Sequence, residues 1–361
     1  MSSSIIRLLR FALEQGASDL HISAGERSSI RINGDLRWID APPLSADDAH
    51  RIIFDVMGDA QRKMLQERLE CDFAYRLDDD TRFRVNAFVQ SRGEGAVFRA
   101  IPNRIPQLAD LGMPEVIRTL CDVEKGLVLV TGPTGSGKST TLASMLDHIN
   151  QTTAGHILTL EDPIEFVHRS KRGLVNQREV GSHTHSFANA LRSALREDPD
   201  VILVGELRDM ETVALALTAA ETGHLVFGTL HTSSAAKTVD RIMDVFPPSQ
   251  QGQVRSMFSE SMVGVVSQML VKTIAGKRAA ALEILVGTPA VRNLIREGKT
   301  NQIASMLQVG AKSGMQTGEA SLADLVNRGV VALAEARSRM PSSELLLAMD
   351  KGAVAPQGGP R

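Results

Sequence analysis

The sequence predicts an α/β fold: a doubly wound, mostly parallel sheet preceded by a small α+β unit and followed by a helical C-terminal extension. From about residue 123, short apolar runs alternate with amphipathic stretches of helical length, which is the rhythm of a doubly wound sheet. The earlier residues instead mix strand-like alternation with helical spacing. A chain of 361 residues also exceeds what one compact core usually covers, so we expect two folded units.

The prolines Pro102 and Pro106 interrupt the pattern between these units, and each biases the residue before it toward extended geometry. We therefore place a linker there. The C-terminal end is rich in glycine, proline and glutamine and has little to bury, so we expect it to be disordered. The expected divisions are an α+β domain at 1–101, a linker with a lead-in helix at 102–122, an α/β domain with a helical C-terminal subdomain at 123–345, and a tail at 346–361.

The elements of the first unit follow from periodicity and turn signals. An Asn33-Gly34 pair between alternating residues indicates a hairpin, because these two residue types suit a tight turn between strands. The expected elements are a helix at 3–15, the hairpin at 29–39, helical spacing at 47–70, and strands at 72–77 and 82–90.

In the second unit, the short apolar runs read as buried parallel strands and the stretches between them as helices. The expected strands are 127–130, 157–160, 201–204 and 225–230. The expected helices are 140–150, 187–197, 211–221 and 235–246. After residue 250 we expect the chain to be mostly helical.

The bulk composition narrows the function. Hydrophobic residues make up 43% of the chain and the formal net charge is −2, so no overall basic field attracts nucleic acid. No apolar run approaches the roughly 20 residues that cross a bilayer, so we expect no integral membrane segment. The two cysteines, Cys71 and Cys121, lie far apart and provide neither a disulfide framework nor a four-cysteine zinc site. A reducing cytoplasm fits best.

A phosphate-binding loop follows the predicted strand 127–130 and opens the next helix. Its glycines let backbone N–H groups face phosphates, Lys138 neutralises the β and γ oxygens, and Ser139 ligates Mg²⁺. The pattern GxxxxGK[ST] in this context predicts ATP and Mg²⁺ as cofactors. The loop and its first flanking residue are Gly132, Pro133, Thr134, Gly135, Ser136, Gly137, Lys138, Ser139 and Thr140.

Hydrolysis also needs groups that hold Mg²⁺ and orient the attacking water, usually at the carboxyl ends of neighbouring strands. Glu206 follows the strand 201–204, and Glu161, Asp162 and Glu165 follow the strand 157–160. We expect Glu206 to face the γ-phosphate and to take part in the Mg²⁺ site. For Asp162 and Glu165 the alternative stays open that a proline-containing loop carries them away as solvated or capping residues.

His224 and His231 bracket the strand 225–230, and His231 at its carboxyl end is placed to hydrogen-bond a phosphate oxygen. His183 and His185 form a polar pair without a third ligand, and we interpret them as surface residues.

Phosphoryl transfer also profits from a cation supplied by another domain or subunit. Arg82 and Arg84 share one face of a predicted strand, and Arg92 and Arg99 flank the next turn and strand. We take Arg82, Arg84 and Arg99 as candidates for an arginine that acts in trans. The alternative is that they form the charged solvent face of an edge strand.

Three motifs together resemble the secretion ATPase superfamily over about residues 1–340: LTLEDPIE at 158–165, LREDPDVILVGELRD at 195–209 with Arg208, and GHLVFGTLHT at 223–232. The resemblance implies a RecA-like P-loop NTPase domain behind a PAS-like N-terminal domain. It also implies that Glu165 activates water, that Glu206 acts with Mg²⁺ and the water, and that His231 senses the γ-phosphate.

The segment AVRNLIRE at 290–297 resembles a helix of the branch that retracts type IV pili, with Val291 in place of isoleucine and with Arg292, Asn293 and Arg296 matching. The resemblance implies a homohexamer with nucleotide between one subunit's ATPase domain and the next subunit's small domain. It implies an inner-membrane pilus platform protein as partner, and a cytoplasmic location, peripheral to that membrane at the pilus base.

Other functions stay open from sequence. One is a pilus extension or type II secretion ATPase, although such relatives usually carry the four-cysteine zinc site that this chain cannot build. Another is an accessory paralogue that joins a retraction ATPase, and a more remote one is a DNA-translocating RecA-like ATPase. The low net charge speaks against nucleic acid as a partner.

Overall fold

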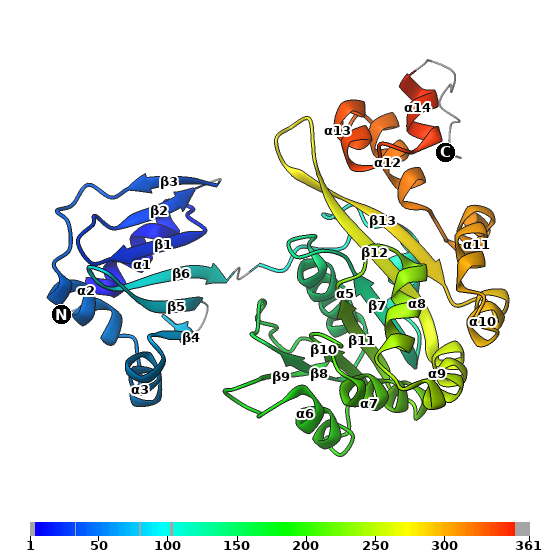
Figure 1. Cartoon of the computed structure of the whole chain (residues 1–361), viewed down its shortest axis with the longest axis horizontal. Coiled ribbons are helices and arrows are strands. Elements are labelled where there is room, and N and C mark those ends of the chain that lie inside the picture. Colours follow the sequence, from blue (N-terminus) through cyan, green and yellow to red (C-terminus); the bar gives the residue numbers. More distant parts are fainter. Residues whose placement is uncertain (1–3, 33, 79–80, 102–103, 351–361) are drawn as a thin grey trace. The chain divides into compact units, whose positions relative to one another are not determined.

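The computed structural model describes residues 4–32, 34–78, 81–101 and 104–350 (Figure 1). The chain divides into two compact units, each described here by itself. The first comprises Met1–Arg104 together with Glu165–Val167, and the second comprises Ile105–Ile164 and His168–Arg361. Pro102, Asn33 and residues 351–361 lie outside the described residues. Within the described part of the chain, no helix is both long and apolar enough to span a membrane.

The first unit is built on a six-stranded sheet with the order β3-β2-β1-β6-β5-β4, in which neighbouring strands are antiparallel (Figure 1). Its elements are α1 (Ser4–Glu14), β1 (Asp19–Ser23), β2 (Ser29–Ile32), β3 (Asp35–Trp38), α2 (Ala46–Phe54), α3 (Asp59–Arg68), β4 (Glu70–Arg76), β5 (Arg82–Gln90) and β6 (Gly93–Ile101).

The helices α1 and α2 bury apolar side chains in one cluster with the sheet, among them Ile5, Ile53 and Phe98. The predicted hairpin is confirmed, since Ile32 pairs with Asp35 across the β2–β3 turn. The helical spacing expected at 47–70 corresponds to two separate helices, α2 and α3, and Gly58 is the N-cap of α3. Glycine costs a helix interior about 1 kcal/mol relative to alanine, so the break falls where a helix is weakest.

The second unit has a seven-stranded sheet with the order β13-β12-β7-β11-β10-β8-β9. Every pairing described in it is parallel except that of β12 with β13. Its elements are α4 (Glu115–Cys121), β7 (Gly126–Thr131), α5 (Lys138–Thr152), β8 (His156–Glu161), β9 (Leu174–Glu179), α6 (Phe187–Ala194), β10 (Val201–Val204), α7 (Met210–Glu221), β11 (Leu225–Leu230), α8 (Ala235–Asp244), α9 (Pro248–Ser261), β12 (Met262–Lys272), β13 (Arg278–Val286), α10 (Pro289–Arg296), η1 (Thr300–Gln302), α11 (Ile303–Val309), η2 (Ala311–Ser313), α12 (Gly318–Asn327), α13 (Leu333–Arg339) and α14 (Glu344–Asp350).

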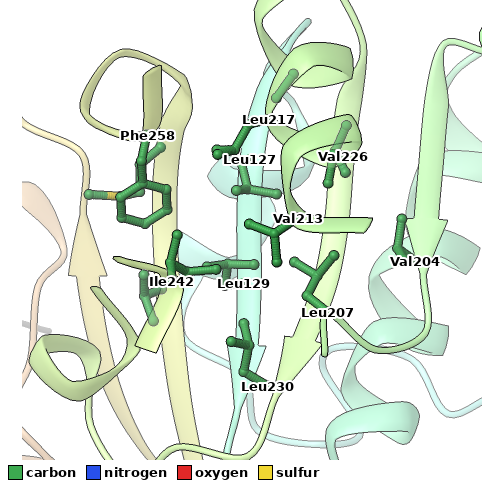
Figure 2. Close-up of a cluster of buried hydrophobic side chains, with 14 of the residues drawn as sticks. Leu127, Leu129, Val204, Leu207, Val213, Leu217, Val226, Leu230, Ile242 and Phe258 are labelled. Atoms are coloured by element: carbon green, nitrogen blue, oxygen red, sulfur yellow. The ribbon is translucent and has the colours of Figure 1, made fainter. Parts of the chain in front are cut away.

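Both faces of this sheet are covered, since alternate residues of the inner strand β7 enter different hydrophobic cores. Leu127 and Leu129 pack in a cluster with α6, α7, α8 and α9, which Figure 2 shows with Val213, Ile242 and Phe258. Val128 and Val130, which alternate with them in β7, pack in a second cluster with α4 and α5. The predicted doubly wound α/β fold is confirmed, and the four strands expected from apolar runs are β7, β8, β10 and β11.

The C-terminal part differs from the expectation in two places. The part after residue 250, expected to be mostly helical, contains a long antiparallel hairpin, β12 and β13, between the helices α9 and α10. β12 pairs in parallel with β7, far away in the sequence, and most of its side chains are buried, so the segment lacks the alternation of buried and exposed residues that indicates a strand. Residues 346–350, expected in the tail, belong to α14, and Leu346 is fully buried.

The described segment that links β8 to β9 contains one buried titratable side chain, His168. Burial lowers the pKa of His168 to about 4, although the nearby Asp147 carboxylate opposes that shift and Lys171 adds to it. The folded protein therefore holds this imidazole neutral at pH values where the unfolded chain protonates it.

We predict that His168→Gln reduces the acid sensitivity of folding. The contribution of a lowered histidine pKa to the free energy of unfolding is complete above about pH 6.5 and is lost as the pH falls toward about 4. At about pH 5 the loss amounts to about 2 kcal/mol. Urea unfolding of the full chain at about pH 7.5 and about pH 5 measures it. The matched control, His185→Gln at an exposed histidine, should keep the wild-type difference. An unchanged difference in His168→Gln would contradict the assignment.

Candidate active site

The loop between β7 and α5 adopts a backbone that only glycine accommodates well. Gly132, Gly135 and Gly137 have φ values of 144°, 77° and 88°, all in the left-handed region. A Cβ at Gly132 would lie 2.3 Å from the carbonyl oxygen of Gln268. Gly137 is the N-cap of α5, so the loop ends at a helix N-terminus. Such a curled loop at a helix N-terminus suits a phosphate.

Three polar side chains lie inside or beside this loop. Lys138 is buried, and its Nζ donates to the carbonyl oxygens of Gly132 at 2.9 Å and Pro133 at 3.1 Å. The hydroxyl groups of Thr131 and Ser136 are buried and find no hydrogen-bond partner among the described residues. Buried polar groups without partners are uncommon in folded proteins, and here they accompany a cradle that fits phosphate oxygens. Ser139 and Thr140, which follow Lys138, are half-buried.

Gln268 on β12 holds the loop in place. Its Nε2 donates to the carbonyl oxygen of Ser136 at 2.7 Å, and its Oε1 accepts from the hydroxyl of Thr141 at 2.8 Å. The side chain is only 4% exposed, so both atoms depend on these partners. Sequence reasoning missed Gln268, because the residues it contacts lie more than a hundred positions earlier. Only a strand prediction at 262–272 would have drawn attention to it.

The carboxyl ends of the parallel strands meet at the same edge of the sheet as the phosphate loop. Thr131 of β7 pairs with Leu230 of β11, and Val204 of β10 pairs with Leu160 of β8. One edge of the sheet therefore carries the phosphate loop, His231, Glu206 and Glu161, each at or just after the carboxyl end of its strand. The sequence predicted this placement.

Glu206 is the centre of a small charged cluster. Its Oε1 lies 2.6 Å from Nε of Arg208 and 3.3 Å from Nε2 of His231. Burial alone would raise the pKa of Glu206, but the hydrogen bond and charge of Arg208, with a contribution from His231, hold it below its usual value. The carboxylate is therefore ionised at neutral pH. An ionised carboxylate at this edge suits a Mg²⁺ ion or a bound water.

The acidic segment after β8 is only partly grouped with these residues. The Glu161 Oε1 accepts from Thr159 Oγ1 at 2.6 Å and from Gln177 Nε2 at 3.0 Å, so this carboxylate is held within the sheet. Asp162 is exposed. Glu165 is also exposed and is assigned with its two following residues to the first unit.

Two of the other histidines named from the sequence, His224 and His183, have local partners. His224 lies at the start of β11, the opposite end from His231, and its Nδ1 contacts the carbonyl oxygen of Ala219 at 3.0 Å. The Nδ1 of His183 accepts from the backbone N–H of Glu179 at 3.0 Å, and His185 is exposed. Among the described residues, no group of three histidine, cysteine, aspartate or glutamate side chains is placed to hold a metal ion.

The candidate arginines of the first unit lie on the face of the sheet opposite its core. Arg82 and Arg84 alternate with buried residues of β5, which agrees with the predicted shared face. Arg84 lies 4.0 Å from Asp72, and Arg99 donates from Nε to Asp19 at 2.8 Å. Arg92 pairs with Glu26, and the buried Nε of Arg82 finds no partner within the described chain.

The segment resembling the retraction helix forms α10. Arg292 donates to the backbone carbonyl oxygens of Gly287 at 2.8 Å and Glu260 at 2.7 Å, so its guanidinium fixes α10 to the end of α9. Asn293 donates to Glu297, and Arg296 lies 3.9 Å from the Glu260 carboxylate. Asn293 and Arg296 are exposed, whereas Arg292 is half-buried.

A pocket of about 680 Å³ adjoins the phosphate loop. Gly137, Thr140 and Gln268 line it at the loop, and Leu270, Ile274 and Val330 line it farther away, from the β12–β13 hairpin and the chain that follows α12. Its size and partly apolar lining suit a nucleoside base.

A doubly wound sheet that carries a glycine phosphate loop, with an ionised acid at the same edge and a pocket beside the loop, defines the class of P-loop nucleotide-binding proteins. Residues 2–338 match the family described as type II/IV secretion system protein. The chain belongs to this family, and it is an ATPase.

Individual relatives are similar over almost their whole length. The type IV pilus retractation ATPase PilT of Pseudomonas aeruginosa is 59% identical over 335 residues, which cover 93% of this chain and 97% of that protein. A twitching motility protein of Neisseria gonorrhoeae is 57% identical over 342 residues, covering 94% and 91%. The crystal structure of the pilus retraction motor PilT with bound ADP matches with a TM-score of 0.89 and 47% identity, covering 95% and 98%.

We predict that Gln268→Met weakens nucleotide binding about 10-fold, because it removes both hydrogen bonds and leaves the Ser136 carbonyl oxygen without its donor. Thr141→Val removes one of the two bonds and should weaken binding less. Titration of the purified protein with a fluorescent ADP analogue measures the affinity. Gln302→Met, the same change at an exposed glutamine, is the control. Equal affinity of Gln268→Met and wild type would show that the loop needs no such anchor.

Proposed function

We propose that this ATPase is a motor that powers retraction of type IV pili and so twitching motility. Its support is the conjunction of the phosphate loop and Glu206 at one sheet edge with similarity to retraction ATPases along nearly the whole chain. The α10 segment, which resembles the retraction branch, adds to that support.

In the proposed site the glycine loop and Lys138 hold the phosphates, and the pocket beside Gly137 takes the base. Ser139 and Glu206 would hold Mg²⁺, directly and through water respectively, and a bound Mg²⁺ would neutralise charge on the β and γ phosphates. Glu206, kept ionised by Arg208, orients water at this edge, and His231 beside it responds to the γ-phosphate. Glu165 is proposed to take the proton from the attacking water.

We further propose that the chain works as a homohexamer in which nucleotide lies between one subunit's second unit and the next subunit's first unit. Arg82, Arg84 and Arg99 would then approach the phosphates in trans. Their position on the open face of the first sheet supports this, because a cation needed by a neighbour has to be on the surface. The ion pair of Arg99 with Asp19 has to be given up or shared if Arg99 is the one that acts.

The proposed partner is an inner-membrane platform protein at the pilus base, which the ring would move as ATP is hydrolysed. The exposed side chains of Asn293 and Arg296 make α10 a candidate contact surface, whereas Arg292 is engaged in holding α9. A peripheral cytoplasmic location follows from this proposal. An accessory retraction ATPase paralogue is a further proposed partner.

We predict that Glu206→Gln lowers kcat for ATP hydrolysis about 100-fold or more, because the amide cannot replace the charge that acts on Mg²⁺ and water. ATP binding should persist, since the phosphate loop is untouched. Phosphate release by the purified protein, with Glu221→Gln as an exposed control on α7, measures the effect. Unchanged turnover would refute the assignment of Glu206.

Deletion of the gene decides the direction of force. Retraction predicts cells that carry excess surface pili and do not twitch, because assembled fibres are no longer withdrawn. Counting surface pili by electron microscopy in the deletion strain, in a strain complemented with the wild-type gene, and in one complemented with Glu206→Gln provides the measurement. Bald cells would assign the protein to pilus assembly instead.

A further inference from the structure

The strand β9 forms the outer edge of the second sheet and pairs in parallel with β8, from which the acidic segment emerges. Gln177 pairs with Thr159 and Glu179 pairs with Glu161, so alternate residues of β9 point to the same face as the last residues of β8. The side chains of Gln177 and Glu179 therefore lie beside the end of β8, where the acidic segment begins.

Gln177 contacts both ends of the turn. Its Nε2 donates to the Glu161 carboxylate at 3.0 Å, and its Oε1 accepts from the backbone N–H of His168 at 2.8 Å. Residues 161 and 168 are thereby connected through one side chain. The intervening residues include the acids that the sequence analysis selected.

Glu179 holds the middle of the same turn. Its Oε2 accepts from the backbone N–H of Ile164 at 3.1 Å, and its Oε1 accepts from the Ser182 hydroxyl at 3.0 Å. The carboxylate is 7% exposed and Ile164 is 4% exposed, so water does not readily replace either partner. Glu165 follows Ile164 directly, so the hydrogen-bonded Ile164 N–H lies one residue before it.

We propose that Glu179 is a positioning residue for ATP hydrolysis, which fixes the backbone at Ile164 so that Glu165 is presented in one orientation. The inference rests on the proposed role of Glu165. Glu179 has both carboxylate oxygens engaged and is buried, which suits a group that holds the chain and not one that exchanges protons with water. A charge-assisted hydrogen bond to a backbone N–H is stronger than a neutral one, which explains an acid at this place.

Three substitutions of Glu179 test whether the length of its side chain or its charge is what matters for hydrolysis. In Glu179→Gln the amide oxygen still accepts from Ile164 and its NH₂ donates to Ser182, so we expect kcat within about threefold of wild type. Glu179→Asp keeps the charge but is one methylene short, and Glu179→Leu keeps the bulk without an acceptor. For these two we expect kcat to fall about 10- to 100-fold with little change in KM, because a displaced general base costs rate more than binding. The measurement is steady-state ATP hydrolysis by the purified full-length chain.

Ser182→Ala is the matched control, since it removes the other partner of the same carboxylate and leaves the bond to Ile164 intact. We expect its kcat to equal that of wild type. If Glu179→Leu does not fold, the order of the other two variants still decides. If Glu179→Gln is more active than Glu179→Asp, the positioning role is supported. If Glu179→Asp is as active as Glu179→Gln or more active, the positioning role is overturned in favour of a role for the charge.

Glu165→Gln, assayed in parallel, separates the two levels of the argument. If it retains wild-type kcat, the proposed role of Glu165 fails and the positioning role fails with it. If Glu165→Gln is inactive and Glu179→Leu is as active as wild type, the proposed function stands and only the role of Glu179 is overturned.

Discussion

The parallel pairing of β7 with β11 on one side and with β12 on the other is the constraint on which the rest of the second unit depends. All six residues of β7 are buried, so the strand cannot shift without disrupting the cores on both faces of the sheet. Its register with β11 sets the phosphate loop beside His231, and the next pairings set Glu206 and Glu161 at the same edge. The backbone hydrogen bonds between buried strands thus position the side chains of the candidate active site.

Local signals explain what could be predicted from the sequence. The phosphate loop and Glu206 are recognisable because the strand, turn and helix that position them are adjacent in the chain. Gln268 and Glu179 could not be found in this way, since each acts through a strand whose partner is decided by long-range packing. The hairpin of β12 and β13 was not predicted, for the same reason. Within the described residues, the sequence predicted the doubly wound sheet correctly but missed the strands at its two edges, β9 on one side and β12 with β13 on the other.

Residues that share a motif in the sequence can have different structural tasks. Arg292 and Arg296 belong to one matching segment, yet Arg292 ties α10 to the end of α9 while Arg296 is exposed. His224 and His231 likewise bracket one strand, but only His231 lies beside Glu206. In each pair the geometry assigns one member to holding the scaffold. A substitution there would therefore act through the fold even though the residue stands inside a functional motif.

The β12–β13 hairpin extends from the phosphate loop to the pocket wall and on to α12 and α13, against which its far part packs (Figure 1). Gln268 touches the loop that suits the phosphates, and Leu270, two residues on, lines the pocket that suits the base. One strand thus contributes residues to both parts of the proposed nucleotide site. Because the same hairpin packs against α12 and α13, a displacement of β12 at the phosphate loop would also displace the pocket wall and these C-terminal helices.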